Sequence, residues 1–121
     1  MKQILLIVLF NLAAFAQSAY AQSEAGKGFF VNACATCHIV EQTGAPRQGP
    51  SLFGIYGNKS GQVEGFKYSD GFKAATLIFD EDTLDKWLAN PVQLVPGTIM
   101  NYRQNNPERR KAIIDYLKSI Q

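Results

Sequence analysis

Residues 34–38 read CATCH, and this short segment contains both cysteines and the only histidine of the 121-residue chain. The two cysteines are three positions apart, about one turn of a helix, so both thiols lie on one face with the imidazole directly after them. A disulfide between them would close a loop of about four residues, which constrains the unfolded chain far less than a long loop does. The segment therefore indicates a binding site and not a structural crosslink.

The pattern Cys-x-x-Cys-His is the attachment motif of c-type haem, in which both thiols bond the haem and the histidine ligates the iron. Three alternatives compete with it: a dithiol redox site, half of a zinc site, and chance. A thioredoxin-like dithiol follows a strand in a βαβ unit, which this sequence lacks, and a four-ligand zinc site needs a second pair of ligands. The motif predicts one haem c bound through Cys34 and Cys37, with His38 as an iron ligand.

The first 21 residues have the layout of a secretory signal peptide: one lysine, an apolar run over residues 4–16, and a small-residue pattern that ends at Ala21. A second small-residue pattern ends at Ala16, but it lies inside the apolar run of the signal peptide. Cleavage there would leave part of that run on the mature protein. The run is shorter than the roughly 20 residues of a membrane span, so a retained anchor is the weaker alternative. We therefore predict cleavage after Ala21, export to the periplasm, and one domain over residues 22–121.

The predicted mature chain is close to neutral. Removal of the leader takes away one lysine and no acid, so 11 basic side chains remain against 10 acidic ones, a formal charge of +1. Nucleic-acid binding domains are usually strongly basic on one face, so this balance gives no reason to expect a nucleic acid as partner.

Three stretches have helical periodicity, and no stretch alternates as a strand would. The first runs from Ser23, a suitable N-cap, to the CATCH segment. The second begins at the N-cap Asp80 and ends before Pro91, and the third begins at the N-cap Asn106 with Pro107 in its first turn. The sequence therefore predicts an all-α domain.

Between the first two predicted helices, residues 41–65 contain six glycines and two prolines. Loops of this length are rare in a compact domain unless something organises them. The three helices alone bury too little to hold such a loop, so we expect it to wrap a large apolar group at the centre of the domain.

Met100 is the only methionine left once Met1 is removed with the leader. Most methionines fill space in a core, and that is the simpler interpretation of this residue. However, a lone thioether on the loop PVQLVPGTIMNYR is well placed to coordinate the iron from the side opposite His38. We therefore predict His38 and Met100 as the two axial ligands.

The mature chain resembles a class I, mitochondrial-type cytochrome c. The motifs GKGFFVNACATCHIV, GPSLFGIYG, FKYSDGFK, EDTLDKWLANP, PGTIM and DYLK follow the order of that family with nearly its spacing. The resemblance implies an all-α cytochrome c fold, with three main helices and long glycine-rich loops around one covalent haem. It also implies that the first and last helices cross where Gly26 and Phe30 meet Tyr116 and Leu117.

The resemblance further implies three haem-binding roles outside the CATCH segment. The carbonyl of Pro50 would accept the ring N–H of His38, Tyr68 would bond a haem propionate, and Thr98 would line the pocket beside Met100. Four positions depart from the family pattern. Phe79 replaces a propionate-binding tryptophan, and Asn58 replaces an arginine. Phe72 replaces an asparagine, and Trp87 replaces a tyrosine over the haem. The propionates should therefore find fewer donors in the protein, while Trp87 fills the pocket.

The function that this resemblance implies is a soluble periplasmic electron carrier, not an enzyme, that acts as a monomer with redox partner proteins and has no stable membrane insertion after cleavage. One alternative is a small peroxidase or a ligand-binding haem protein, which would need an open sixth position and usually a distal acid-base residue. The chain has no second histidine for that role. Another alternative is a subunit docked permanently to one oxidoreductase.

The family surrounds its exposed haem edge with lysines, and this chain has lost most of them. Uncharged residues stand at the matching positions: Ala33, Val92, Gln93 and Ile99. Only Arg47 keeps a positive charge there. We therefore expect docking that is mainly apolar and only weakly sensitive to salt. The alternative is that the basic residues have moved and still face the partner, for instance as Lys73, Lys86 or Arg103.

Overall fold

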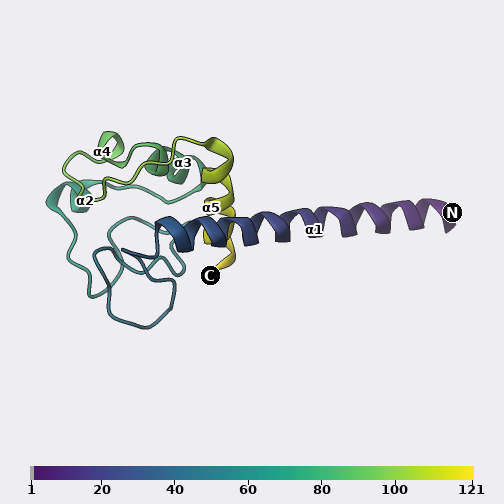
Figure 1. The fold of residues 1–121 in the computed structure, drawn as a ribbon, viewed down its shortest axis with the longest axis horizontal. Helices are drawn as coiled ribbons and strands as arrows, with labels where there is room; N and C mark the ends of the chain where they lie inside the picture. Colours follow the sequence, from purple (N-terminus) through teal and green to yellow (C-terminus); the bar gives the residue numbers. More distant parts are fainter. Residues whose placement is uncertain (1) are drawn as a thin grey trace.

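The computed structural model describes the backbone of residues 2–121 and the side chains of residues 13–121. Its helices are α1 (Lys2–Ala33), α2 (Asp70–Ala74), α3 (Glu81–Ala89), α4 (Pro91–Leu94) and α5 (Pro107–Ser119). Within residues 2–121 no strand is formed, and the only sheet-like pairing is an isolated bridge between Lys59 and Ile78. The fold is therefore all-α, as the sequence predicted. Figure 1 shows α1 crossing α5 and extending away from the rest of the molecule.

The predicted start of the first helix is wrong. Ser23 lies inside α1, and its hydroxyl donates to the Ser119 hydroxyl at 3.1 Å instead of capping a helix. A side chain caps only where backbone N–H groups lack helical partners, and here the preceding residues continue the helix. Met1 and the side chains of residues 2–12, part of the predicted signal peptide, lie outside the described residues. Cleavage after Ala21 therefore stays a prediction.

Helices α1 and α5 pack closely where they cross. The backbone of Gly26 lies so near α5 that a Cβ at this position would come within 1.9 Å of the Ala112 carbonyl oxygen. One turn later, the rings of Phe30 and Tyr116 meet with their centroids 5.4 Å apart. Phe30, Tyr116 and Leu117 are all buried in the core. The expected crossing of the first and last helices is confirmed.

The other predicted helix starts are confirmed by their caps. The carboxylate of Asp80 accepts the N–H of Thr83 at 2.8 Å, and the amide oxygen of Asn106 accepts the N–H of Arg109 at 2.9 Å. Helix α3 ends before Pro91, which itself opens α4. Helices α2 and α4 were not expected, because four or five residues are too few to show a periodic pattern. Within the described residues, none of the helices combines the length and the hydrophobicity of a membrane span.

The glycine-rich segment folds back on later parts of the chain. The buried hydroxyl of Ser60 donates to the Ala75 carbonyl at 2.9 Å and accepts the Leu77 N–H at 3.1 Å. The N–H of Gly54 donates to the carbonyl of Ile120 at 2.8 Å, which ties the segment to the end of α5. Five of its glycines adopt positive φ, where a side chain would be strained: Gly44, Gly54, Gly57, Gly61 and Gly65.

Candidate functional site

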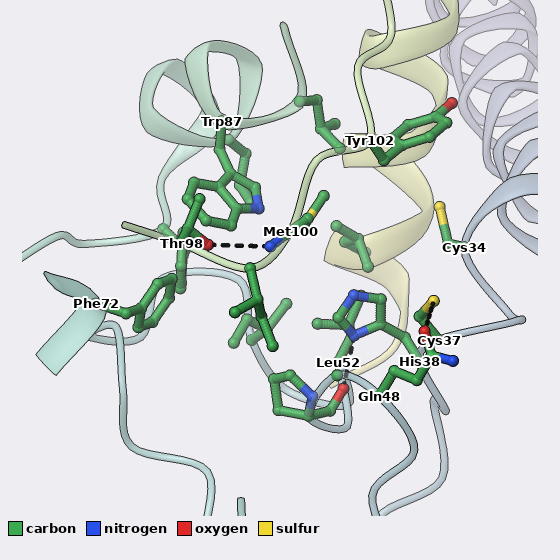
Figure 2. Close-up of a pocket in the computed structure, with 18 of the residues that line it drawn as sticks. Cys34, Cys37, His38, Gln48, Leu52, Phe72, Trp87, Thr98, Met100 and Tyr102 are labelled. Atoms are coloured by element: carbon green, nitrogen blue, oxygen red, sulfur yellow. Dashed lines mark hydrogen bonds between the residues drawn. The ribbon is translucent and has the colours of Figure 1, made fainter. Parts of the chain in front are cut away.

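One cavity of about 240 Å³ opens between the end of α1, the glycine-rich segment, α3, α5 and the segment that contains Met100. Its wall is mostly aliphatic and aromatic, and no charged side chain is among the described residues that line it. All eight residues predicted for the site line this cavity: Cys34, Cys37, His38, Pro50, Tyr68, Trp87, Thr98 and Met100. Figure 2 labels all of them except Pro50 and Tyr68. The structure therefore brings together residues that span 67 positions of the chain, from 34 to 100.

The CATCH segment forms one further turn at the end of α1. The N–H of Cys34 donates to the Phe30 carbonyl at 2.7 Å, and the N–H groups of Cys37 and His38 both donate to the Cys34 carbonyl at 3.0 and 2.9 Å. This turn places both thiols at the edge of the cavity, and neither forms a disulfide. Burial, with a smaller electrostatic contribution from the neighbouring Cys37, raises the pKa of Cys34 to about 11. The Cys37 thiol donates to the side-chain oxygen of Gln48 at 3.3 Å.

His38 is held with one ring nitrogen toward the protein and the other toward the cavity. Its Nδ1 lies 2.8 Å from the carbonyl oxygen of Pro50, the contact that the sequence predicted. A carbonyl can only accept, so Nδ1 carries the proton and Nε2 keeps a free lone pair. Burial lowers the pKa of His38, and the hydrogen bond to Pro50 acts in the opposite direction. A Cβ at Gly49 would come within 2.3 Å of the imidazole, so only glycine fits beside the ring.

Met100 reaches the cavity from a different segment. Figure 2 shows the side chains of Met100 and His38 directed into the same space from separate parts of the chain. The backbone N–H of Met100 donates to the hydroxyl of Thr98 at 3.3 Å, which fixes the local turn. Thr98 therefore lies beside Met100 on the cavity wall, as expected. Met100 itself is half-buried and contacts the hydrophobic core.

A group of aromatic rings forms the wall near Met100. Tyr68 stacks on Phe72 with centroids 5.0 Å apart, and Phe72 meets the edge of Trp87 at 5.5 Å. Phe79 lies 6.4 Å from Trp87, whose side chain is buried. Three of the four positions that depart from the family pattern, Phe72, Phe79 and Trp87, therefore contribute apolar surface to the cavity. The fourth, Asn58, lies outside the wall and donates to the Gly54 carbonyl.

Tyr68 keeps a proton available for the cavity. Its hydroxyl oxygen accepts the N–H of Val63 at 3.3 Å, so its own O–H is not used in that contact. Burial raises the pKa of Tyr68, and the hydrogen bond from Val63 acts in the opposite direction. At neutral pH this side chain is therefore a neutral hydrogen-bond donor, suited to a carboxylate.

Several cavity residues were missed by the sequence analysis, and Tyr102 is the most informative of them. It stands two positions after Met100 on a segment without helix, where alternate side chains point to the same side. That spacing could have identified Tyr102 as a neighbour of the predicted ligand. The other missed residues are bulky or polar groups that no local pattern distinguishes from core or loop: Gln48, Leu52, Phe66, Ser69 and Asn101.

The residues at this cavity fit a covalently attached haem. Two thiols lie one turn apart at its edge, an imidazole presents a free nitrogen, and a thioether reaches in from another segment. The apolar wall suits a large planar group, and haem iron in proteins takes histidine and methionine as axial ligands.

Comparison with known proteins agrees with this geometry. The family model described as Cytochrome c matches residues 23–121. Cytochrome c2 iso-2 of Magnetospirillum molischianum is 43% identical over 99 residues, which cover 81% of this chain and 99% of the relative. Cytochrome c of Ginkgo biloba is 36% identical over 107 residues, 88% of this chain and 95% of the relative. The solved structure of cytochrome cH from Methylobacterium extorquens superposes with a TM-score of 0.72 at 37% identity, covering 80% of this chain and 97% of that one.

Proposed function

The chain belongs to the cytochrome c family, electron carriers that bind haem c covalently, and from this premise we propose the roles of its site residues, its location and its mode of docking. Cys34 and Cys37 would attach the haem through thioethers, and His38 and Met100 would ligate its iron. The proposal rests on one observation. Three of these side chains come from residues 34–38 and the fourth, Met100, comes from a distant segment, yet all four line one apolar cavity.

When bound, the haem supplies an iron centre that gains and loses one electron. Pro50 holds His38 through its carbonyl, so the ligating nitrogen keeps a constant orientation in both oxidation states. The Met100 thioether favours ferrous iron, and the uncharged wall disfavours the extra positive charge of ferric iron. These residues together support a high reduction potential and little rearrangement during transfer.

The remaining predicted residues position the macrocycle. Tyr68 donates its free O–H to a propionate, Thr98 keeps the Met100 turn, and Trp87 packs on the haem face. Because no cation is among the described residues of the wall, the propionates would depend on such neutral donors. Because His38 and Met100 would both ligate the iron and the chain has no second histidine for a distal acid-base role, we expect a carrier and not an enzyme.

The leader pattern supports a periplasmic location. Its predicted cleavage after Ala21 falls two residues before the start of the region that matches the family, residue 23. Redox proteins of the same compartment are the partners, and the mature protein acts as a soluble monomer.

The surface around the cavity supports apolar docking. Ile99, which lines the cavity mouth, is 73% exposed, and Val92 is 40% exposed. A patch of this kind, without charge, suits brief contacts of modest area with a partner whose docking face is also poor in charge.

Spectroscopy and mass spectrometry of the protein purified from a periplasmic fraction test the proposal. The intact mass should equal residues 22–121 plus one haem, and the ferrous spectrum should not change on brief exposure to carbon monoxide. Rapid carbon monoxide binding would favour the peroxidase or ligand-binding alternative. Stoichiometric co-purification with one oxidoreductase would favour a fixed subunit, and a mass that includes residues 1–21 would show a retained leader.

A further inference from the structure

Residues 98–106, called here the Met100 segment, are held by a network of hydrogen bonds and an ion pair. The electron-carrier function does not by itself require this network. We propose that Gln104 and Arg110 are positioning residues, which latch this segment over the cavity and so determine how readily the Met100 thioether gives way to an external ligand. The proposal rests on the proposed ligation of iron by Met100.

Gln104 connects the Met100 segment to two other parts of the molecule, α3 and the start of α5, and also contacts Tyr102 within the segment. Its backbone N–H donates to the Leu88 carbonyl of α3 at 2.8 Å. Its side-chain nitrogen donates to the hydroxyl of Tyr102 at 2.9 Å, and its side-chain oxygen accepts the N–H of Asn106 at 3.1 Å. One glutamine therefore ties a cavity-lining ring to α3 and to the start of α5.

Arg110 on α5 completes the network with two further sets of contacts. Its guanidinium pairs with the Asp85 carboxylate of α3, with Nε to Oδ1 at 2.6 Å and Nη2 to Oδ2 at 3.4 Å. The remaining nitrogen, Nη1, donates to the backbone carbonyls of Gln104 at 3.0 Å and Asn105 at 3.2 Å. Only 14% of the Arg110 side chain is exposed, so these bonds are partly shielded from water. The fork shape of the guanidinium allows all four contacts at once.

The network acts on the same helix that builds the cavity. Asp85 and Leu88, which receive the contacts from Arg110 and Gln104, flank Trp87 on α3, and Leu88 and Trp87 both line the cavity. The Met100 segment is thus hydrogen-bonded to α3, which forms part of the cavity wall. Opening the segment would break hydrogen bonds to a charged group, which are stronger than neutral ones. The thioether is therefore retained in the ligating position.

A second ion pair between the same two helices offers a matched control. Lys118 of α5 pairs with Glu81 of α3 at 2.6 Å, and within the part of the chain that the structure describes neither residue forms a hydrogen bond or ion pair with residues 98–106. The test compares Arg110→Lys, Gln104→Ala and Lys118→Gln in the haem-loaded protein. Lysine keeps the charge opposite Asp85 but lacks the fork that reaches the two carbonyls. The measurements are the rate of imidazole binding to the ferric form, the sulfur-to-iron charge-transfer band, and the denaturation midpoint.

The latch predicts a rise of about tenfold or more in the imidazole binding rate for Arg110→Lys and Gln104→Ala, because these variants lack charge-assisted or part-buried hydrogen bonds that opening must break in the wild type. The control Lys118→Gln should change that rate less than about twofold at a comparable loss of stability. Equal rates in the three variants and the wild type, or a rise in the control that matches theirs, overturn the proposal.

Deuterium exchange separates failure of the latch from failure of the ligation. If the wild type lacks the charge-transfer band, Met100 is not the ligand, and the latch is then judged by exchange in residues 98–106. Faster exchange there in Arg110→Lys than in Lys118→Gln supports the latch, and equal exchange overturns it.

Discussion

Helices α1 and α5 differ from the segments around the cavity in what their apolar side chains face. In the helix pair, Phe30 packs on Tyr116, and Ile113 and Ile114 are almost fully buried, at 1% and 2% exposure. Around the cavity, several wall residues instead stay partly exposed: Pro50, Leu52, Met100 and Tyr102. The polypeptide alone can make the contacts of the helix pair. The residues around the cavity can make comparable apolar contacts only when a bound group fills the cavity.

The variant with the largest expected effect removes the covalent attachment of the haem. Cys34→Ser combined with Cys37→Ser should leave the apo chain largely unfolded, because residues 41–65 then have nothing to wrap. A domain of this size is stabilised by about 5–15 kcal/mol in total, and we expect most of that to be lost. Far-UV circular dichroism and denaturant titration of the secreted variant measure it. A cooperative, helix-rich transition would show that the hydrogen bonds of Ser60 and Gly54 organise the segment without haem.

A second test acts on the cavity alone. Met100→Ala should abolish the weak sulfur-to-iron charge-transfer band of the ferric protein, open the ferrous protein to carbon monoxide, and lower the reduction potential. The neighbouring variant Ile99→Ala serves as control, because Ile99 is 73% exposed and should leave the band unchanged. An unchanged band in Met100→Ala would mean that another residue, or none, is the ligand.

A third test acts on the helix pair alone. Gly26→Ala should lower the free energy of unfolding by about 1–3 kcal/mol, because the new Cβ would meet the Ala112 carbonyl. Gly28→Ala, two residues away, meets nothing within 4 Å and should be neutral or stabilise by about 0.5–1 kcal/mol through helix propensity. Both variants should keep the charge-transfer band. Thermal unfolding followed by circular dichroism distinguishes them, and similar midpoints would contradict the close packing of α1 on α5.

The smallest expected effect concerns the rim of the cavity. The second-order rate of electron transfer with the natural partner should change less than about tenfold between low and physiological salt, because Arg47 is the one cation expected at this edge and no charged side chain is among the described residues that line the cavity. Stopped-flow kinetics at several ionic strengths measure this, with Ile99→Lys as a variant in which salt dependence should increase. A steeper fall in the wild type would show that basic residues outside the rim steer the partner.

Much of the site could be predicted because its chemistry is local. Cys34, Cys37 and His38 form a motif within five residues, and Asp80 and Asn106 cap helices that begin directly after them. The contact between His38 and Pro50 was predicted only through the family resemblance, and the 2.8 Å distance confirms it. The start predicted at Ser23 failed because a capping residue alone does not show whether the residues before it are already helical.

Residue type and short spacing by themselves determined the haem-binding motif, the helical class of the domain and the one candidate thioether, Met100. Only the tertiary structure decided that Tyr102 faces the same cavity and that Gln104 and Arg110 hold the segment between them and Met100. The pairing of Arg110 with Asp85 joins positions 25 residues apart. No periodicity along the chain records such a contact, because it arises from how α3 and α5 pack.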